Sequence, residues 1–259
     1  DEDQIENCEG AERESTNFII PKNVLIGGLW ELEALSRNYV NKGNVTVWNG
    51  TNFANARKMT FQDTFQINVT LNNTLSLLNT EINCTIYFPN GSIFWNKSKE
   101  PSGLEVVFGN LTVGENMTTG TYIAIIEWTN NQSSLSRDKI GYRRLTFNVW
   151  HDTTLTPVDS YLERKSGEPL LIKVKYMDSD INTPLDSTAE SPTTVRYNSS
   201  FGTSGSLVYV GSGVYSAEVD TSYLQNGTYY FSFNAPKQYY ANQTNQARIT
   251  LKIIKQSLK

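Results

Sequence analysis

Thirteen asparagines in this chain are followed two positions later by serine or threonine, with no proline between them. This N-x-S/T pattern is the acceptor sequence for N-linked glycans. It occurs more often than chance placement of the chain's asparagines, serines and threonines would give. The sequons are Asn44, Asn49, Asn68, Asn72, Asn83, Asn90, Asn96, Asn110, Asn116, Asn131, Asn198, Asn226 and Asn242. Their number predicts a glycosylated protein at the cell surface, outside the cell.

The placement of two sequons supports this prediction. In the stretch NVTL, Asn68 has the opposite parity to Ile67 and Val69, and in NCTI Asn83 has the opposite parity to Cys84. In an extended strand, opposite parity means opposite faces. These asparagines would therefore face solvent, as attachment of a glycan requires.

The two cysteines suggest a disulfide bridge. Cys84 shares its parity with apolar neighbours and should face inward, whereas Cys8 lies in an acidic N-terminal stretch. In an oxidising compartment the natural pairing is Cys8 with Cys84, and it would contribute roughly 4 kcal/mol by constraining the unfolded chain. A buried free Cys84 and a bridge to another chain remain the alternatives.

The sequence offers little for metal or catalytic chemistry. Asp178, Asp180 and Asn182 have the spacing that opens a calcium loop, but the glycine and glutamate of that loop are missing, so a polar turn is the simpler interpretation. His151 is the sole histidine and is expected to be a linker residue. One histidine and two cysteines cannot build an ordinary zinc site. We therefore expect no enzyme, no cofactor and no firm metal site.

The elements that position these residues are predicted to be β-strands. The stretches GTYIAIIEW (120–128) and GTYYFSFNA (227–235) each place apolar residues on one face with a period of two. Turn signals such as Pro89-Asn90-Gly91 separate the apolar runs. The only helix candidate, residues 29–36, is short. The sequence predicts an all-β fold.

The strands recur as a tandem repeat with a period of about 105 residues, the size of one small domain. The paired stretches are 51–58 with 159–166, 65–71 with 170–176, 120–128 with 227–235, and 145–150 with 249–254. Pro157 and a threonine-rich run at 151–157 mark the junction. The predicted organisation is an N-terminal extension at 1–44, one domain at 45–152 and a second at 153–259.

The N-terminal extension has no counterpart in the second unit. Its apolar stretch at 17–32 alternates and must be buried somewhere, either as an extra strand of its own domain or as a donor strand for a neighbouring subunit. Ile123 and Ile125 make the strand at 120–128 apolar on both faces, which indicates a cover there. The predicted assembly contact comprises Val24, Leu25, Ile26, Leu29, Trp30, Ile123 and Ile125.

The stretch from Gly213 to Ile253, with its GTY and ITLKI motifs, resembles immunoglobulin-like domains of prokaryotic surface proteins. YMDSDINTPLD (176–186) is similar to a strand–turn passage common in those domains. GTYIAIIEWTN and RRLTFNVWHDTTLTP in the first unit resemble repeats of large secreted archaeal proteins of the S-layer and adhesin type. The resemblance covers residues 45–257 and implies two tandem immunoglobulin-like β-sandwich domains with an N-terminal extension.

Two functions fit these observations. The first is a non-enzymatic structural protein that joins copies of itself by β-strand addition into a surface filament or layer. The alternative is an adhesin stalk or a carbohydrate-binding module of a larger secreted protein. The net charge of −4, without a basic stripe, argues against nucleic acid as a partner. No apolar run is long enough for a membrane span.

Overall fold

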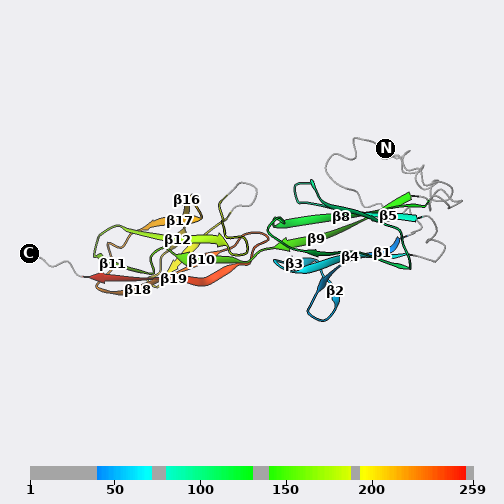
Figure 1. Ribbon diagram of the computed structural model, residues 1–259. Coiled ribbons are helices and arrows are strands. Elements are labelled where there is room, and N and C mark those ends of the chain that lie inside the picture. Colours follow the sequence, from blue (N-terminus) through cyan, green and yellow to red (C-terminus); the bar gives the residue numbers. More distant parts are fainter. Residues whose placement is uncertain (1–39, 72–79, 131–139, 188–192, 255–259) are drawn as a thin grey trace, which may run out of the picture. The chain divides into compact units, whose positions relative to one another are not determined.

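The computed structural model describes residues 40–71, 80–130, 140–187 and 193–254, and in these ranges all the regular structure is β (Figure 1). The chain forms two compact units, the first ending at Val149 and the second beginning at Trp150. Each unit contains two β-sheets that share one hydrophobic core. Residues 40–44, expected in the N-terminal extension, form part of the first strand instead.

In the first domain the sheets have the strand orders β2-β1-β4-β7 and β3-β9-β8-β5-β6. The first sheet consists of β2 (Phe53–Asn55), β1 (Val40–Trp48), β4 (Thr64–Leu71) and β7 (Glu105–Thr112). The second consists of β3 (Lys58–Thr60), β9 (Ile140–Trp150), β8 (Gly120–Asn130), β5 (Thr80–Tyr87) and β6 (Ile93–Lys99).

In the second domain the orders are β10-β12-β17-β16, with β13 paired to β12, and β11-β19-β18-β14-β15. The first sheet consists of β10 (Thr153–Pro157), β12 (Leu170–Asp178), β13 (Thr183–Pro184), β17 (Val214–Val219) and β16 (Val208–Gly211). The second consists of β11 (Tyr161–Lys165), β19 (Gln243–Ile254), β18 (Gly227–Ala235), β14 (Arg196–Ser199) and β15 (Ser204–Ser206). β11 runs parallel to β19.

The two domains follow one topology. The order β1-β4-β7 matches β10-β12-β17, and β3-β9-β8-β5-β6 matches β11-β19-β18-β14-β15. In each domain the chain then crosses to the edge of the other sheet, directly after the opening strand in the second domain and after the β1–β2 hairpin in the first. This is the arrangement of an immunoglobulin-like sandwich. The predicted fold class, two tandem domains of this kind, is confirmed.

Three of the four repeat pairs fall on equivalent strands, namely β4 with β12, β8 with β18, and β9 with β19. The fourth pair is wrong. Residues 51–58 contribute β2, which pairs with β1, whereas 159–166 contain β11, which pairs with β19. The true counterpart of β11 is β3, because a short hairpin is inserted between the first strand and β3 in the first domain.

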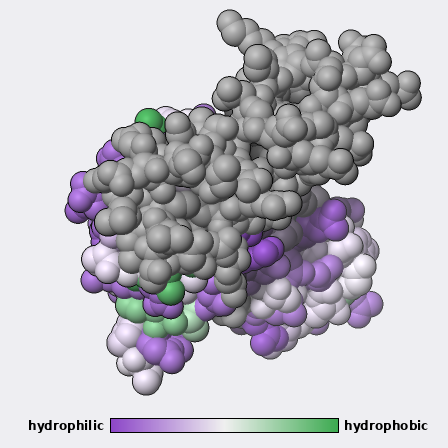
Figure 2. Space-filling model, turned by 90° about the vertical axis from the view of Figure 1, so that its right-hand side faces the viewer, coloured by the Kyte–Doolittle hydropathy of each residue, from purple (hydrophilic) through white to green (hydrophobic). Residues whose placement is uncertain are grey.

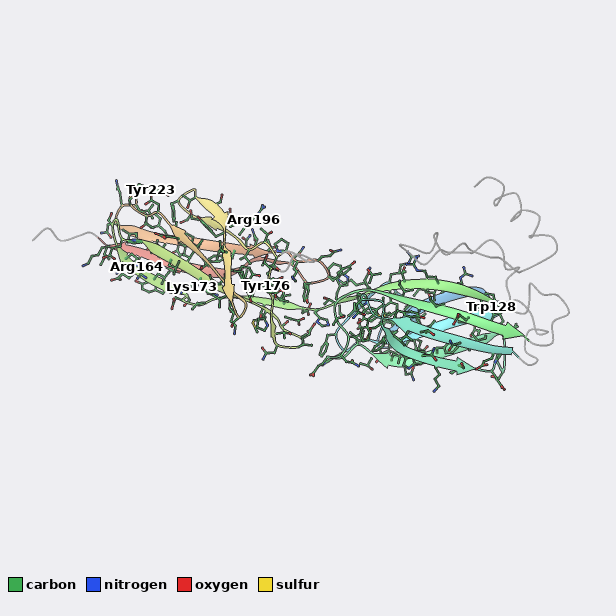
Figure 3. The ribbon with its side chains drawn as sticks, turned by 90° about the horizontal axis from the view of Figure 1, so that it is seen from above. Trp128, Arg164, Lys173, Tyr176, Arg196 and Tyr223 are labelled. Atoms are coloured by element: carbon green, nitrogen blue, oxygen red, sulfur yellow. The ribbon has the colours of Figure 1, made fainter. Side chains whose placement is uncertain are left out.

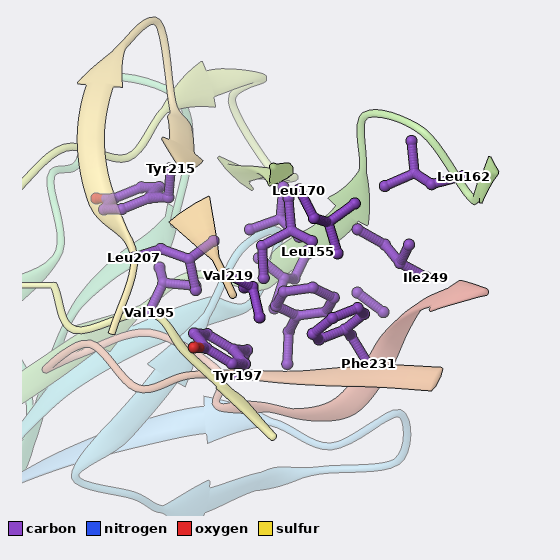
Figure 4. Close-up of a cluster of buried hydrophobic side chains, with 14 of the residues drawn as sticks. Leu155, Leu162, Leu170, Val195, Tyr197, Leu207, Tyr215, Val219, Phe231 and Ile249 are labelled. Atoms are coloured by element: carbon purple, nitrogen blue, oxygen red, sulfur yellow. The ribbon is translucent and has the colours of Figure 1, made fainter. Parts of the chain in front are cut away.

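Alternation along the strands builds both cores. Burial in β4 and β12 switches at every residue, and the inward residues Phe65, Ile67 and Val69 are at most 1% exposed. Tyr122 stacks on Phe147 with ring centroids 5.3 Å apart. Figure 4 shows the corresponding cluster of the second domain, where Phe231 and Ile249 are fully buried. Each such side chain contributes about 1.5–3 kcal/mol.

The repeated Gly-Thr-Tyr phrase marks the same corner in both domains. The Tyr122 hydroxyl donates to the Thr118 carbonyl oxygen at 2.9 Å, and the Tyr229 hydroxyl donates to that of Gln225 at 3.1 Å. A tyrosine at the start of this strand that bonds back to the preceding turn is the tyrosine corner of immunoglobulin-like domains. Gly120 has a φ of +135°, and a Cβ there would lie 2.7 Å from Pro89 Cγ, so the corner needs glycine.

Tyr122→Phe should destabilise the first domain by about 1 kcal/mol, because the ring keeps its packing while the Thr118 carbonyl loses its donor. Tyr122→Ala should cost about 3–5 kcal/mol, because the stack on Phe147 is lost as well. Urea unfolding measures both values. Tyr230→Phe is the control, since Tyr230 is 38% exposed. Equal effects of Tyr122→Phe and Tyr230→Phe would contradict the corner's role.

Candidate functional site

The sequons are the most numerous candidate sites, and those in the described residues all reach solvent. Eight are exposed: Asn49, Asn90, Asn96, Asn110, Asn116, Asn198, Asn226 and Asn242. Asn44, Asn68 and Asn83 are half-buried on strands. Asn72 and Asn131 lie outside the described residues. Figure 2 shows one face of the molecule, where the described residues are mostly hydrophilic.

Turns hold some sequons in a geometry that suits a glycan. The Oδ1 atom of Asn49 accepts hydrogen bonds from the backbone of Thr51 and Asn52, at 3.0 and 2.9 Å. The Oδ1 atom of Asn90 accepts from the backbone and the hydroxyl of Ser92. The amide oxygen thus fixes the side chain. The glycan would attach to the nitrogen of the same amide.

Strand sequons are more constrained. The Nδ2 atoms of Asn83 and Asn96 both donate to the Thr85 hydroxyl, at 3.3 and 2.6 Å, and Thr85 is only 3% exposed. Asn44 lies directly opposite Asn68 in the β1–β4 register. A glycan on any of these residues must share its space with a neighbouring sequon.

Ile123 and Ile125 lie on the outer face of β8, but they offer little free surface. Ile125 is 8% exposed although it points away from the core, and Ile123 is half-buried. Ile125 lies between Thr85 and Arg144 in the sheet register. The other predicted assembly residues, Val24, Leu25, Ile26, Leu29 and Trp30, lie outside the described residues.

Cys84 has the inward orientation that its parity indicates. It is completely buried, and burial raises the pKa of its thiol to about 12. The thiol is free, and Cys8 lies outside the described residues. The suggested Cys8–Cys84 bridge therefore stays a prediction.

His151, which the sequence suggested to be a linker residue, is buried. It is 2% exposed, and its Nδ1 atom lies 2.6 Å from Oδ2 of Asp178, which is 1% exposed. The pairing of β10 with β12 brings the start of one strand beside the end of the other, and Thr153 is opposite Asp178. No local sequence signal indicates this contact, because it depends on the register between β10 and β12.

The contact with His151 changes the set of residues that could bind calcium at the predicted site. His151, Asp178 and Asp180 have ligand atoms within 4.8 Å of one another. The Oδ1 atom of Asp178 accepts from the backbone of Asp180 and Ile181, and Oδ2 faces His151. Asn182, the third predicted ligand, is exposed in a left-handed turn with φ of 53°. The arrangement holds the turn after β12 against the start of β10.

A second buried polar group, Lys237, was not predicted from the sequence. Its Nζ atom donates to the Thr193 hydroxyl at 3.0 Å and to the Asp186 carbonyl at 3.2 Å. Burial lowers the pKa of this amine. No motif surrounds Lys237 in the sequence. Its contacts tie together two segments that lie 44 or more residues apart.

An open pocket of about 470 Å³ lies in the first domain between β1 and β9. Residues 43–45, 55–57 and 143–146 line it, and three of them are the arginines Arg57, Arg143 and Arg144. These guanidinium groups can hold an anion. The described lining residues include no carboxylate, imidazole or thiol, the groups on which acid–base and nucleophilic catalysis most often depend.

No protein-family model matches the chain, and no curated protein matches it. It is similar to the fibronectin(III)-like modules of Clostridium thermocellum CbhA, with 15% identity and a TM-score of 0.31 over 83% of this chain and 96% of that one. It is similar to a tetra-tandem repeat from the extending region of a large adhesion protein, with 15% identity and a TM-score of 0.45 over 81% and 49%.

A further likeness is to domains 4 and 5 of the S-layer protein SbsC, with 10% identity and a TM-score of 0.28 over 83% of this chain and 98% of that one. These identities and TM-scores are too low to assign a family or a function to the chain. The fold assignment rests on the strand order and the two tyrosine corners. No helix among the described residues is long and apolar enough to cross a membrane.

Asp178→Ala should destabilise the second domain by about 3 kcal/mol, because it leaves the buried His151 imidazole and two part-buried backbone N–H groups without their partner. Asp180→Ala is the control on the same turn and should cost less. A double-mutant cycle with His151→Ala, followed by urea unfolding, measures the coupling. Strict additivity of the two changes would contradict the pairing.

Cys84 should resist alkylation in the native protein at pH 8, since the thiolate is the reactive form and a pKa of about 12 keeps it scarce. Unfolding in urea without a reductant should make it react at once. Mass spectrometry of the alkylated peptides gives both results. If Cys84 reacts in urea only after reduction, a disulfide is present and the free thiol is wrong.

Proposed function

We propose that this chain is a non-enzymatic, N-glycosylated structural protein of an extracellular surface, and that it assembles with copies of itself by β-strand addition into a filament or layer. The observation that carries the proposal is the position of the sequons. All eleven that fall in the described residues reach solvent on two packed sandwiches, and eight are exposed. Dense N-glycosylation suits a protein that functions outside the cell.

The architecture supports a structural role. Each domain has its own core and its own tyrosine corner, so the chain is a pair of similar modules. The polar clusters of the described residues serve internal bonds. Asp178 holds a turn and His151, and Lys237 holds a loop. These uses favour a scaffold over a catalyst.

Assembly is assigned to the N-terminal segment. Its residues from Val24 to Trp30 are apolar and partly alternating, a pattern that pairs well with an open sheet edge. A subunit that gives one strand and receives another makes a heterologous contact. Such contacts build an open filament unless the rotation between subunits closes a ring.

One observation favours the alternative, a carbohydrate-binding module or adhesin stalk. Tyr161 and Tyr230 are 52% and 38% exposed, and both pair with Thr250 in the register of β11, β19 and β18. Two strand spacings separate them, about 10 Å. Arg248 already covers the Tyr230 ring at 3.8 Å from its centroid, which leaves Tyr161 as the freer aromatic face.

Native protein should have a mass well above 29.2 kDa, and enzymatic or chemical deglycosylation should return it to that value. Glycopeptide analysis should find the exposed turn sequons, such as Asn49 and Asn90, more fully occupied than Asn83, whose amide nitrogen is hydrogen-bonded. An unmodified mass from native material would contradict the proposal.

Deletion of residues 1–36 should abolish polymers seen by negative-stain microscopy and sedimentation, while leaving folded monomers. Unchanged polymers would contradict strand donation. Wholesale unfolding would show that the segment completes its own domain. Binding of the full chain to an insoluble polysaccharide, lost in Tyr161→Ala, would favour the alternative instead.

A further inference from the structure

The edge strand β16 of the second domain is unusually apolar. Val208 and Val210 are 70% and 57% exposed, among the most exposed large hydrophobic side chains of the described residues. β16 ends its sheet, since β17 is its partner in the strand order. The sequence of the strand, VYVG, contains neither a charge nor a proline. The one feature of β16 that discourages pairing with another strand is a register shift between Tyr209 and Gly211.

The other sheet edges carry devices that discourage pairing. β3, β6, β7 and β11 contain charged residues, and β10 ends in Pro157. β6 and β7 also contain the sequons of Asn96 and Asn110, and Asn49 lies in the turn before β2. β15 is the three-residue stretch SGS, which has no large side chain. Among the edge strands that the structure describes, only β16 combines an uncharged sequence with exposed large aliphatic side chains.

The sheet that ends in β16 is also the only one of the four described sheets whose strands hold no sequon. Of the three sequons of the second domain, one lies on a strand of the other sheet and two lie in the turns that lead into its strands. Asn198 lies on β14, Asn226 directly precedes β18, and Asn242 directly precedes β19. Glycans exclude macromolecules from the surface around them. A protein partner should therefore bind where they are missing.

The outer face of this sheet continues the β16 surface. One cross-strand row runs from Val208 through Ser216 and Lys173. Figure 3 labels Lys173 on β12. Lys175 lies two residues further along the same face. This face also includes one acidic residue, Glu218 on β17. The face thus offers aliphatic side chains at its edge and two lysines behind them, on a chain whose net charge is −4.

We infer that the β16 edge is the acceptor site for the N-terminal segment of a second copy of this chain. The segment at 17–32 would add as a strand beside β16, so that its apolar face lies next to Val208 and Val210. This inference rests on the proposed function and names the receiving half of the assembly contact.

The chemistry of the N-terminal segment matches this edge. Phe18, Ile20, Val24, Ile26 and Trp30 share one parity and would line one face of the added strand. The preceding residues 1–14 include seven carboxylates and one arginine, a charge opposite to that of Lys173 and Lys175. The first sequon is Asn44, so the segment carries no glycan acceptor. Thirty-nine residues precede β1, enough to extend to a neighbour.

The contact can be located by photo-crosslinking in the full-length chain. Val208→benzoylphenylalanine places a photoreactive group on β16, and Tyr161→benzoylphenylalanine on the sequon-bearing sheet is the matched control. A mixture of ¹⁴N and ¹⁵N copies is irradiated and digested. We expect mixed-isotope peptides that join position 208 to residues 12–32, and none from position 161. Links within one copy only, or links to another region, would overturn the inference.

Substitution tests the same edge by its effect on assembly. Val208→Lys with Val210→Lys should raise the concentration needed for half-assembly at least tenfold, a factor that corresponds to about 1.4 kcal/mol. Val158→Lys is the matched control, because Val158 is 51% exposed beside the opposite edge strand, β10, of the same sheet. Circular dichroism verifies that both variants are folded.

The outcomes separate this inference from the proposed function. If the full chain assembles and the double variant assembles equally well, the β16 acceptor is wrong and the structural role stands. If the full chain does not assemble at any concentration, self-assembly itself is wrong and the inference falls with it. Equal losses in the double variant and in Val158→Lys would also overturn the assignment to β16.

Discussion

Alternation of side chains along the strands is the constraint on which the rest of this structure depends. In β4 every second residue is buried, and the residues between them reach solvent. The same switch decides chemistry as well as packing, because Asn68 falls on the outer parity and Phe65 on the inner one. A shift of register by one residue would bury the glycan acceptor and expose the core. The alternation thus determines both which residues form the core and which sequon asparagines face solvent.

The two domains use one topology with different outer surfaces. In the first, sequons lie on strands of both sheets, and on β8 even an outward residue such as Ile125 is covered. In the second, only one sheet has a sequon on a strand, Asn198 on β14, and the outer face of β18 is polar apart from Tyr230. The shared tyrosine corner, made by Tyr122 and Tyr229, shows that the framework is conserved between the two domains while the surface is free to differ.

Strand-level features could be predicted from sequence because they are local. The period of two identified the inward faces of β4 and β8, and the GTY phrase identified equivalent strands. Contacts between distant segments could not be predicted. The His151–Asp178 pair depends on how β10 aligns with β12, and Lys237 depends on the path of a loop. The pairing of 51–58 with 159–166 failed because similar residue types occur on strands that belong to different sheets.

If Asn83 carries a glycan, as we propose, the burial of Thr85 constrains when that glycan is attached. Thr85 completes the acceptor sequence of Asn83, yet its hydroxyl is enclosed by the amides of Asn83 and Asn96 once β5 and β6 are paired. A glycosylating enzyme must contact that hydroxyl to recognise the site. Any sugar on Asn83 was therefore attached to a nascent or unfolded chain. The occupancy of this one residue records whether modification or folding came first.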